Sequence, residues 1–399
     1  MAHRPASIAW MGPSLDRPLG VAIVGGGFAA ASHRDALRRV PGAIAVGVLA
    51  STPERSREAA ARLGVEQGYA SLDDLLRDGD VDAVHNCTPN VLHHEVTAAA
   101  LAAGKHVLSE KPLAFDLTEA DDLVARAREI GVVTGVCFTY RHFPLIQHLR
   151  ARLASGAGGP VHLMHGAYLQ DWLLFEDDWN WRLEADQAGE ARAVGDIGSH
   201  WVDLVQHVTG DEVVAVCAQL ARLHDERLRS GEVRAFERDD GGTRTRVAVD
   251  TEDAATILLR FRGGATGACT ISQVSAGRKN ALTIELDAAR ESYAWNQEDP
   301  NVLEIGRRDA PNERILRDPS LVADEAIPLV HFPGGHQEGW PDAMRNLVED
   351  FYGVVRGERP RPTFASFDEA AQVQAVVDAV VRSHREGRWV DVRSEVTTP

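Results

Sequence analysis

Two side chains near the middle of the sequence have the types and the spacing to act on a hydroxyl group. Asp196 and His200 lie four residues apart, and on a helix this spacing places both side chains on one face. Because histidine titrates near neutrality, His200 could accept a hydroxyl proton as a general base. Asp196 could orient the imidazole or bind a neighbouring hydroxyl. An isolated pair of this kind is more often a surface ion pair or a helix cap, so its interpretation depends on the rest of the chain.

The same pair could also bind one metal ion, since this spacing suits two ligands on a helix. The local sequence offers no obvious third ligand. The run His93-His94-Glu95 is too closely spaced to converge from a helix, and His162 and His165 would lie on opposite faces of a strand. We therefore expect no metal site.

A glycine-rich turn near the start of the chain has the spacing of a phosphate-binding loop. Gly25, Gly27 and Ala30 match the pattern G-x-G-x-x-G/A, which follows an apolar run and opens a helix-like stretch through Phe28 and Ala29. The first glycine permits the tight turn, the second lets the backbone approach a pyrophosphate, and the third small residue allows close packing. The pattern predicts a dinucleotide site, and an ordinary strand-to-helix turn is the alternative.

The end of the second predicted strand bears on which dinucleotide binds. A carboxylate there would hold the ribose 2′-hydroxyl and favour NAD, but the sequence has Leu49-Ala50-Ser51-Thr52. Ser51, Thr52 and Arg55 could instead receive a 2′-phosphate, which favours NADP. NAD stays open, because Arg55 could equally be a solvated helix residue.

Alternating elements place these residues in an α/β fold. Apolar runs at residues 21–24, 43–49, 81–87, 106–109 and 132–138 alternate with helix-like stretches, a pattern typical of a parallel sheet covered by helices. After about residue 140 the pattern changes, and residues 254–261 and 265–274 flank a hairpin turn. We predict an N-terminal Rossmann dinucleotide-binding domain over residues 20–139. An α+β domain with a large, mostly antiparallel open sheet follows over residues 140–393, and residues 1–19 and 394–399 are loose tails.

The bulk composition fits two domains and excludes some partners. The chain has 399 residues and a net charge of −17, which disfavours nucleic acid and anionic membrane surfaces. Four widely spaced cysteines form no CxxC pair, so we expect reduced thiols in a cytoplasmic protein. No stretch is long and apolar enough to span a bilayer.

Further motifs make the interpretation more specific. The sequence contains Glu110-Lys111-Pro112 after a predicted strand, and also Thr88-Pro89-Asn90-Val91-Leu92-His93, Tyr140-Arg141-His142-Phe143-Pro144, Gly195-Asp196-Ile197-Gly198-Ser199-His200 with Asp203, and Gly387-Arg388-Trp389-Val390. In this order the motifs resemble those of the Gfo/Idh/MocA family from about residue 20 to 393. Residues 168–172 and 334–340 resemble the branch that contains levoglucosan dehydrogenase and glycoside 3-dehydrogenases.

The resemblance implies a fold, a reaction and a set of site residues. The fold is a Rossmann domain followed by an open-sheet domain that often builds homodimers or homotetramers. The reaction is hydride transfer between a nicotinamide and a hydroxyl-bearing carbon of a sugar, polyol or glycoside. The implied catalytic residues are Lys111, Asp196 and His200, where Lys111 would stabilise a developing alkoxide. The implied cofactor-binding residues are Gly25, Gly27, Phe28, Ala29, Ser51, Thr52, Arg55, Thr88, Pro89, Asn90, His93, Glu110 and Lys111.

Substrate recognition is expected from aromatic and arginine side chains, because aromatic faces stack on sugar rings and guanidinium groups donate to hydroxyls. The candidates are Tyr140, Arg141, Trp172, Trp181, Arg182 and His336. The tryptophans could instead serve only in packing. Glu190 departs from the paired glycines that the family often carries before the catalytic helix, which puts the local pocket shape in doubt.

Two other functions stay open. A reductase of a keto-sugar or imine would use the same groups in the opposite direction. A non-enzymatic regulator that senses NAD(P) would need only the dinucleotide site, and the intact Lys111, Asp196 and His200 set argues against it.

Overall fold

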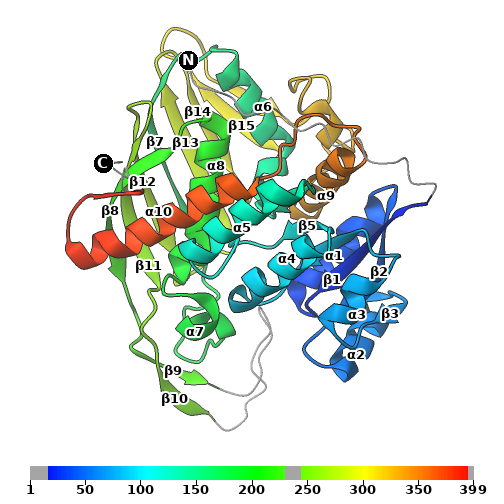
Figure 1. Cartoon of the computed structure of the whole chain (residues 1–399). Helices are drawn as coiled ribbons and strands as arrows, with labels where there is room; N and C mark the ends of the chain where they lie inside the picture. Colours follow the sequence, from blue (N-terminus) through cyan, green and yellow to red (C-terminus); the bar gives the residue numbers. More distant parts are fainter. Residues whose placement is uncertain (1–16, 230–243, 394–399) are drawn as a thin grey trace, which may run out of the picture. The chain divides into compact units, whose positions relative to one another are not determined.

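The computed structural model describes residues 17–229 and 244–393 (Figure 1). Of the predicted tails 1–19 and 394–399, positions 1–16 and 394–399 lie outside the described residues. The prediction is wrong at Leu19, which is buried and begins the first strand. Within the described part, unit 1 comprises residues 17–114, 118–137 and 344–368, and unit 2 comprises the remainder. Each unit is compact and has its own sheet.

Unit 1 is built on a parallel sheet whose strands are blue to cyan in Figure 1. The strand order is β3-β2-β1-β4-β5-β6, and every pairing is parallel. The strands are β1 (Leu19–Val24), β2 (Ala43–Leu49), β3 (Gln67–Gly68), β4 (Ala83–Asn86), β5 (His106–Ser109) and β6 (Thr134–Val136). This confirms the predicted Rossmann sheet.

The helices of unit 1 begin and end at sequence signals. Thr52 caps α2 by accepting the backbone N–H of Arg55 on its hydroxyl, Pro53 occupies the first turn, and Gly64 ends the helix in the left-handed region with a φ of 63°. The other helices are α1 (Phe28–Arg39), α3 (Leu72–Arg77), α4 (His93–Ala102), α5 (Leu117–Ile130) and α9 (Trp340–Val355), with α2 spanning Pro53–Leu63. A short 3-10 helix, η1, covers Asn90–Leu92.

Unit 2 contains a nine-stranded sheet in the order β16-β15-β14-β13-β7-β12-β11-β8-β17, and its strands are mostly green to yellow in Figure 1. All neighbours are antiparallel except β7 and β12, which pair in parallel. The prediction of a mostly antiparallel sheet is therefore confirmed. The strands are β7 (Val161–Leu169), β8 (Val213–Ala221), β11 (Ala254–Phe261), β12 (Thr266–Ser272), β13 (Ala281–Ala288), β14 (Ser292–Asn296), β15 (Val302–Gly306), β16 (Glu313–Leu316) and β17 (Val390–Asp391).

A separate two-stranded ribbon and several helices complete unit 2. The ribbon pairs β9 (Glu226–Arg229) with β10 (Thr245–Ala248). The helices are α6 (Pro144–Ala154), α7 (Ala185–Ala188), α8 (Ser199–Thr209) and α10 (Phe367–Glu386), with 3-10 turns η2 (Thr139–His142), η3 (Trp181–Leu183) and η5 (Ile327–Leu329) and the π-helical turn η4 (Val194–Gly198). None of the helices in residues 17–229 and 244–393 is long and apolar enough to cross a membrane.

Helix α8 is anchored on the large sheet. It packs on β7 and β13 and against α6. Trp201 on α8 is fully buried and donates its indole N–H to the carbonyl of Thr283 on β13 at 3.0 Å. Gly166 on β7 makes this approach possible, because a Cβ there would lie 2.1 Å from the Thr283 carbonyl oxygen.

Candidate active site

Asp196 and His200 lie in unit 2, but not on one regular α-helix. Asp196 belongs to the π-helical turn η4, and His200 is the second residue of α8. The prediction that both side chains share one helix face assumed 3.6 residues per turn. The π-helical turn has a different spacing, so this assumption does not hold between Asp196 and His200. Turns of this type often occur at functional sites.

Both carboxylate oxygens of Asp196 accept hydrogen bonds. Arg182 donates its Nε–H to Oδ1 at 3.1 Å, and Gln273 donates from Nε2 to Oδ2 at 2.8 Å. The orientation of the Gln273 amide is fixed, because its Oε1 accepts from Arg192 Nη1 at 3.0 Å and a guanidinium can only donate. Asp196 therefore faces two donors, an arrangement that stabilises its ionised form.

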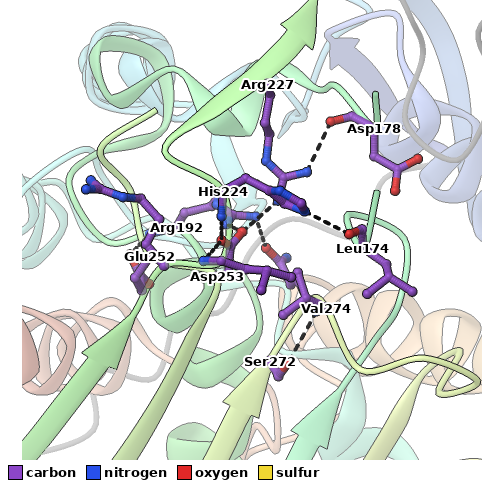
Figure 2. Close-up of polar contacts among 12 residues, drawn as sticks. Leu174, Asp178, Arg192, His224, Arg227, Glu252, Asp253, Ser272 and Val274 are labelled. Carbon is purple, nitrogen blue, oxygen red and sulfur yellow. Dashed lines mark hydrogen bonds and ion pairs between the residues drawn. The ribbon is translucent and has the colours of Figure 1, made fainter. Parts of the chain in front are cut away.

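A buried cluster of charges supports this arrangement (Figure 2). Arg192 and Arg227 both donate to Asp253, and all three side chains are almost fully buried. Asp253 also accepts the backbone N–H groups of Leu223 and His224. Burial alone would raise the pKa of Asp253, but the two guanidinium groups and the Leu223 N–H outweigh burial and lower it.

Glu252 holds the start of the segment that carries Asp196. Its two carboxylate oxygens accept the backbone N–H groups of Arg192 at 2.9 Å and Val194 at 2.8 Å. An acidic side chain at the N-terminal end of a helical segment is favourable. Glu252 and Asp253 thus fix the backbone and the side chain of Arg192, and through Gln273 they fix Asp196.

His200 is surrounded by aromatic rings of unit 2. The ring centroid of Tyr140 lies 4.9 Å from that of the imidazole, Phe138 lies at 5.7 Å, and Tyr168 lies at 6.3 Å. The Tyr140 and Phe138 rings present edge-to-face geometries, which are favourable for aromatic pairs. These contacts fix the plane of the imidazole.

Tyr140 and Tyr168 form a closed hydrogen-bond ring with Asn280. The two hydroxyls lie 2.6 Å apart, Tyr168 donates to Asn280 Oδ1 at 2.5 Å, and Asn280 donates from Nδ2 to the Tyr140 hydroxyl at 3.1 Å. Burial raises the pKa of both tyrosines, so both keep their protons. Gln170 also donates to Asn280, and Trp172 donates its indole N–H to Gln170. The ring of polar groups is thereby joined to Trp172.

Arg141, a predicted substrate residue, forms ion pairs with the carboxylates of Asp203 and Glu369. It is buried and makes a bidentate pair with Asp203 on α8, with contacts of 2.8 and 2.6 Å, and it contacts Glu369 on α10 at 3.1 Å. These bonds tie the η2 turn to α8 and α10. This geometry suits a role in holding α8 more than direct contact with a substrate.

The remaining predicted substrate residues are more accessible. Arg182 lies over the Trp181 ring at 4.6 Å from the centroid, so one face of that indole is covered by a cation. His336 is exposed in the segment before α9. Glu190, the departure from the family pattern, is exposed and pairs with Arg385 on α10 at 3.0 Å.

In unit 1 the glycine-rich turn has the geometry that a pyrophosphate requires. Gly25 adopts a φ of 122°, and a Cβ there would lie 2.3 Å from the carbonyl oxygen of Cys87. Gly27 is the N-cap of α1, and a Cβ there would meet no atom of the described residues within 4 Å. The backbone N–H groups of the first helical turn have no partners within the helix and suit an anion. Phe28 is exposed, Ala29 is partly exposed and Ala30 is buried.

The end of β2 carries the three residues predicted to distinguish the cofactors. Ser51, Thr52 and Arg55 are exposed, and Arg55 Nη1 donates to the Ser51 hydroxyl at 3.3 Å. The Thr52 hydroxyl already accepts the backbone N–H of Arg55 as the N-cap of α2. A hydroxyl and a guanidinium thus stand side by side at the position where an acidic residue would select NAD.

The loop after β4 and the Glu110-Lys111-Pro112 segment are joined by His93. Its Nδ1 lies 2.6 Å from the Pro112 carbonyl oxygen, and its Nε2 lies 2.9 Å from that of Thr88. Burial lowers the pKa of His93 against the effect of these carbonyls. His93 is buried, so its geometry suits positioning of the two loops. Pro89 is exposed, and Asn90, Glu110 and Lys111 are partly exposed.

Several residues of this site were not predicted from the sequence. Gln273, Arg192, Glu252 and Asp253 surround Asp196 but belong to no local motif. Asn280 likewise joins two tyrosines that precede it by more than a hundred residues. Tyr168 lies within the segment that resembles the levoglucosan dehydrogenase branch, which was the one available signal.

Comparisons with known proteins agree with this architecture. Residues 19–138 match the oxidoreductase family with an NAD-binding Rossmann fold, and residues 146–292 match the GFO/IDH/MocA C-terminal domain. The chain is 31% identical to levoglucosan dehydrogenase of Pseudarthrobacter phenanthrenivorans over 94% of its own length and 98% of that protein. The chain belongs to the Gfo/Idh/MocA family. The predicted resemblance is confirmed, and this family member is an NAD(P)-dependent oxidoreductase.

Solved structures of other family members are similar over nearly the whole chain. Levoglucosan dehydrogenase in complex with NADH and levoglucosan superimposes with a TM-score of 0.84 at 28% identity, covering 95% of this chain and 100% of that one. An inositol dehydrogenase homologue from Azotobacter vinelandii, in complex with NADH and myo-inositol, gives a TM-score of 0.80 at 27% identity, covering 94% and 98% of the two chains.

Proposed function

We propose that this Gfo/Idh/MocA protein oxidises a secondary hydroxyl of a cyclic sugar, polyol or glycoside. The observation that carries the proposal is the carboxylate of Asp196, held by two donors, in the segment that leads into His200. Two similar proteins bind levoglucosan and myo-inositol, each a ring with several hydroxyl groups. Trp172, Trp181 and Arg182 are the proposed substrate contacts, because they are partly exposed and offer aromatic faces and donors. Tyr140 is buried, so its proposed role is to support His200.

The proposed roles follow from the chemistry of an alcohol that loses a hydride and a proton. His200 would accept the hydroxyl proton and Lys111 would stabilise the developing negative charge on the oxygen, while a nicotinamide cofactor held by unit 1 would supply the hydride acceptor. Asp196 accepts hydrogen bonds from Arg182 and Gln273. Its carboxylate would orient the imidazole or accept a hydrogen bond from a substrate hydroxyl.

The proposed cofactor is NADP, bound along the glycine-rich turn of unit 1. The N-terminus of α1 would face the pyrophosphate, with Gly27 leaving room for it. Ser51 and Arg55 would contact the 2′-phosphate. The loop around Thr88 and Asn90 and the Glu110-Lys111 segment would lie at the nicotinamide end. NADH in the complexes of two similar proteins makes NAD the competing outcome.

We also propose that the predicted domain of residues 20–139 binds the cofactor and that the predicted domain of residues 140–393 binds the substrate and forms a homodimer or homotetramer. Residues 344–368 are the exception, because they pack with unit 1. The four cysteines are free thiols, which supports a reducing cytoplasmic location.

A fluorescence titration with NADH and NADPH tests the cofactor proposal. NADPH should bind more tightly, and Arg55→Ala should weaken NADPH binding about 10-fold while leaving NADH binding unchanged, because it removes a charge-assisted contact. Arg57→Ala is the matched control, since Arg57 lies on the same helix and pairs with Glu54. Tighter NADH binding by the wild type would refute the NADP assignment.

Turnover then tests the substrate class. Levoglucosan, myo-inositol and simple glucosides should be offered with the preferred oxidised cofactor, and the corresponding ketones with the reduced one. We expect oxidation of at least one cyclic polyol. Turnover of ketones or imines alone, with no alcohol oxidised, would favour the biosynthetic reductase.

A further inference from the structure

Four polar side chains form a continuous buried chain inside unit 1. Glu110 Oε1 lies 3.2 Å from His33 Nε2, His33 Nδ1 lies 2.8 Å from His85 Nδ1, and His85 Nε2 lies 2.9 Å from the Tyr352 hydroxyl. His33, His85 and Tyr352 are all 0% exposed, and the Glu110 side chain is 21% exposed. The four residues come from the segment after β5, from α1, from β4 and from α9.

The ionised carboxylate of Glu110 can only accept, so His33 Nε2 donates to it. The roles in the other two bonds depend on the tautomers of the two imidazoles. One set satisfies all three bonds with both imidazoles neutral: Tyr352 donates to His85 Nε2, and His85 Nδ1 donates to His33 Nδ1. The four side chains therefore form one connected hydrogen-bond network that ends on the carboxylate.

The carboxylate at the end of this chain is also bonded to the backbone of Lys111. Glu110 Oε2 accepts the Lys111 backbone N–H at 3.2 Å, and the Glu110 backbone N–H is bonded to the Asn86 carbonyl at 2.8 Å. Glu110 Oε1 thus contacts His33 in the interior of unit 1, and Glu110 Oε2 accepts the backbone N–H of Lys111. A rotation of Glu110 would release both contacts.

We propose that Tyr352, His85 and His33 are positioning residues that fix the Glu110 carboxylate and, through it, the backbone of Lys111. This proposal rests on the proposed catalytic role of Lys111. The chain suits positioning more than proton release, because its far end, Tyr352, is fully buried. The surrounding groups that titrate or carry charge include Cys87, Cys137 and His93 beside Glu110, and Asp82 and Arg356 near Tyr352.

A metal ion is the competing explanation for part of this cluster. His33 Nε2, a Glu110 oxygen and Cys137 Sγ lie within 4.8 Å of one another, and this donor set suits Zn²⁺. The hydrogen-bonded interpretation is favoured because it accounts for all four side chains.

Steady-state kinetics of graded variants test the proposal. Tyr352→Phe removes only the last hydroxyl and should lower kcat about 3- to 10-fold, whereas His33→Leu removes the bond to the carboxylate and should lower it about 10- to 100-fold. His33→Gln retains a donor toward Glu110 and should restore part of the loss. Cofactor affinity should stay within a few-fold, and the substrate deuterium isotope effect should rise as hydride transfer becomes slower.

A matched control separates positioning from stability. Tyr69 is a buried tyrosine of unit 1 that donates to Asp78 at 2.8 Å, so Tyr69→Phe should lower Tm without lowering kcat. If Tyr352→Phe and His33→Leu lower only Tm and leave kcat and the isotope effect at wild-type values, the positioning role is refuted. Stoichiometric Zn²⁺ retained on dialysis and lost in Cys137→Ser would also overturn it. A Lys111→Ala variant with wild-type activity would instead refute the proposed function.

Discussion

The role assigned to Gln273 gives the sharpest prediction, because this one amide connects Asp196 to the buried charges. Gln273→Leu removes the 2.8 Å bond to Asp196 and leaves Arg192 Nη1 without its 3.0 Å acceptor. A hydrogen bond to a charged group contributes about 1.5–3 kcal/mol, so kcat/KM should fall about 10- to 150-fold. The unpaired guanidinium N–H should also cost about 1–3 kcal/mol of stability.

Gln273→Glu provides a second test with a distinct signature. The introduced carboxyl group can still accept from Arg192, but it would stand about 2.8 Å from Asp196. Two ionised carboxylates at that distance repel by about 6 kcal/mol at an effective dielectric constant of about 20. Holding one extra proton at pH 7 costs only about 4 kcal/mol from an ordinary pKa near 4. The pair should therefore keep a shared proton near neutral pH.

The shared proton predicts an unusual pH profile for Gln273→Glu. At acidic pH the introduced carboxyl group is protonated and donates to Asp196 as the amide did, so activity should be close to that of the wild type. Activity relative to the wild type should fall at least about 10-fold as the pH rises and the proton is lost. The stability of Gln273→Glu should change with pH in the same direction as its activity. A carboxyl group whose pKa is raised in the folded state stabilises the fold at low pH, and that contribution is lost as the pH rises.

The assay is kcat/KM across pH for the wild type and both variants, with unfolding measured in parallel. Gln372→Leu is the matched control, since Gln372 on α10 donates to the backbone carbonyl of Val213, the first residue of β8 in unit 2. The reasoning fails if Gln273→Leu keeps wild-type kcat/KM, or if the ratio of Gln273→Glu to wild type does not change with pH.

Three further predictions follow from other parts of the structure. His200→Ala and Lys111→Ala should each lower kcat about 10²- to 10⁴-fold, with cofactor affinity nearly unchanged in His200→Ala, and equal turnover of wild type and variants would remove both residues from the mechanism. Gly27→Ala should nearly keep its Tm, since the added Cβ meets no atom of the described residues within 4 Å, but should weaken cofactor binding in a fluorescence titration; unchanged binding would place the pyrophosphate elsewhere. Arg152, Tyr293 and Arg307 lower the pKa of the buried Glu291 to about 2, so Glu291→Gln should cost about 3 kcal/mol at pH 7 by denaturant unfolding. Because a lowered pKa stabilises the fold above the ordinary value, this difference should vanish as the pH falls from about 4.5 toward 2, and a constant difference would contradict it.

The parts of the fold predicted from the sequence are those with strong local signals. Apolar runs alternating with helices predict the parallel sheet of unit 1, and Thr52, Pro53 and Gly64 predict the ends of one helix. The hairpin of β11 and β12 follows from its glycine turn. The parallel pairing of β7 with β12 has no local signal, because about a hundred residues separate the two strands.

The candidate site also has a part with local sequence signals and a part without them. Motifs predict Lys111, Asp196 and His200 as candidates, but the side chains that hold them come from distant segments. Gln273 reaches Asp196 across 77 positions, and Tyr352 reaches His85 across 267. Side-chain contacts between distant segments depend on packing, which periodicity does not encode. The π-helical turn at Asp196 likewise lies outside any rule based on regular helix spacing.

The measurement that tests the central claim most directly is turnover of a ring-deuterated cyclic polyol by the purified protein. Levoglucosan and myo-inositol, each deuterated at the carbinol carbons, should be offered with NADP and NAD while nicotinamide absorbance is followed, and the products analysed by NMR and mass spectrometry. The account predicts a ketone, a reduced cofactor that carries the deuterium, and loss of both in His200→Ala. Cofactor binding without any deuterium transfer from a broad panel of cyclic polyols, sugars and glycosides would contradict it.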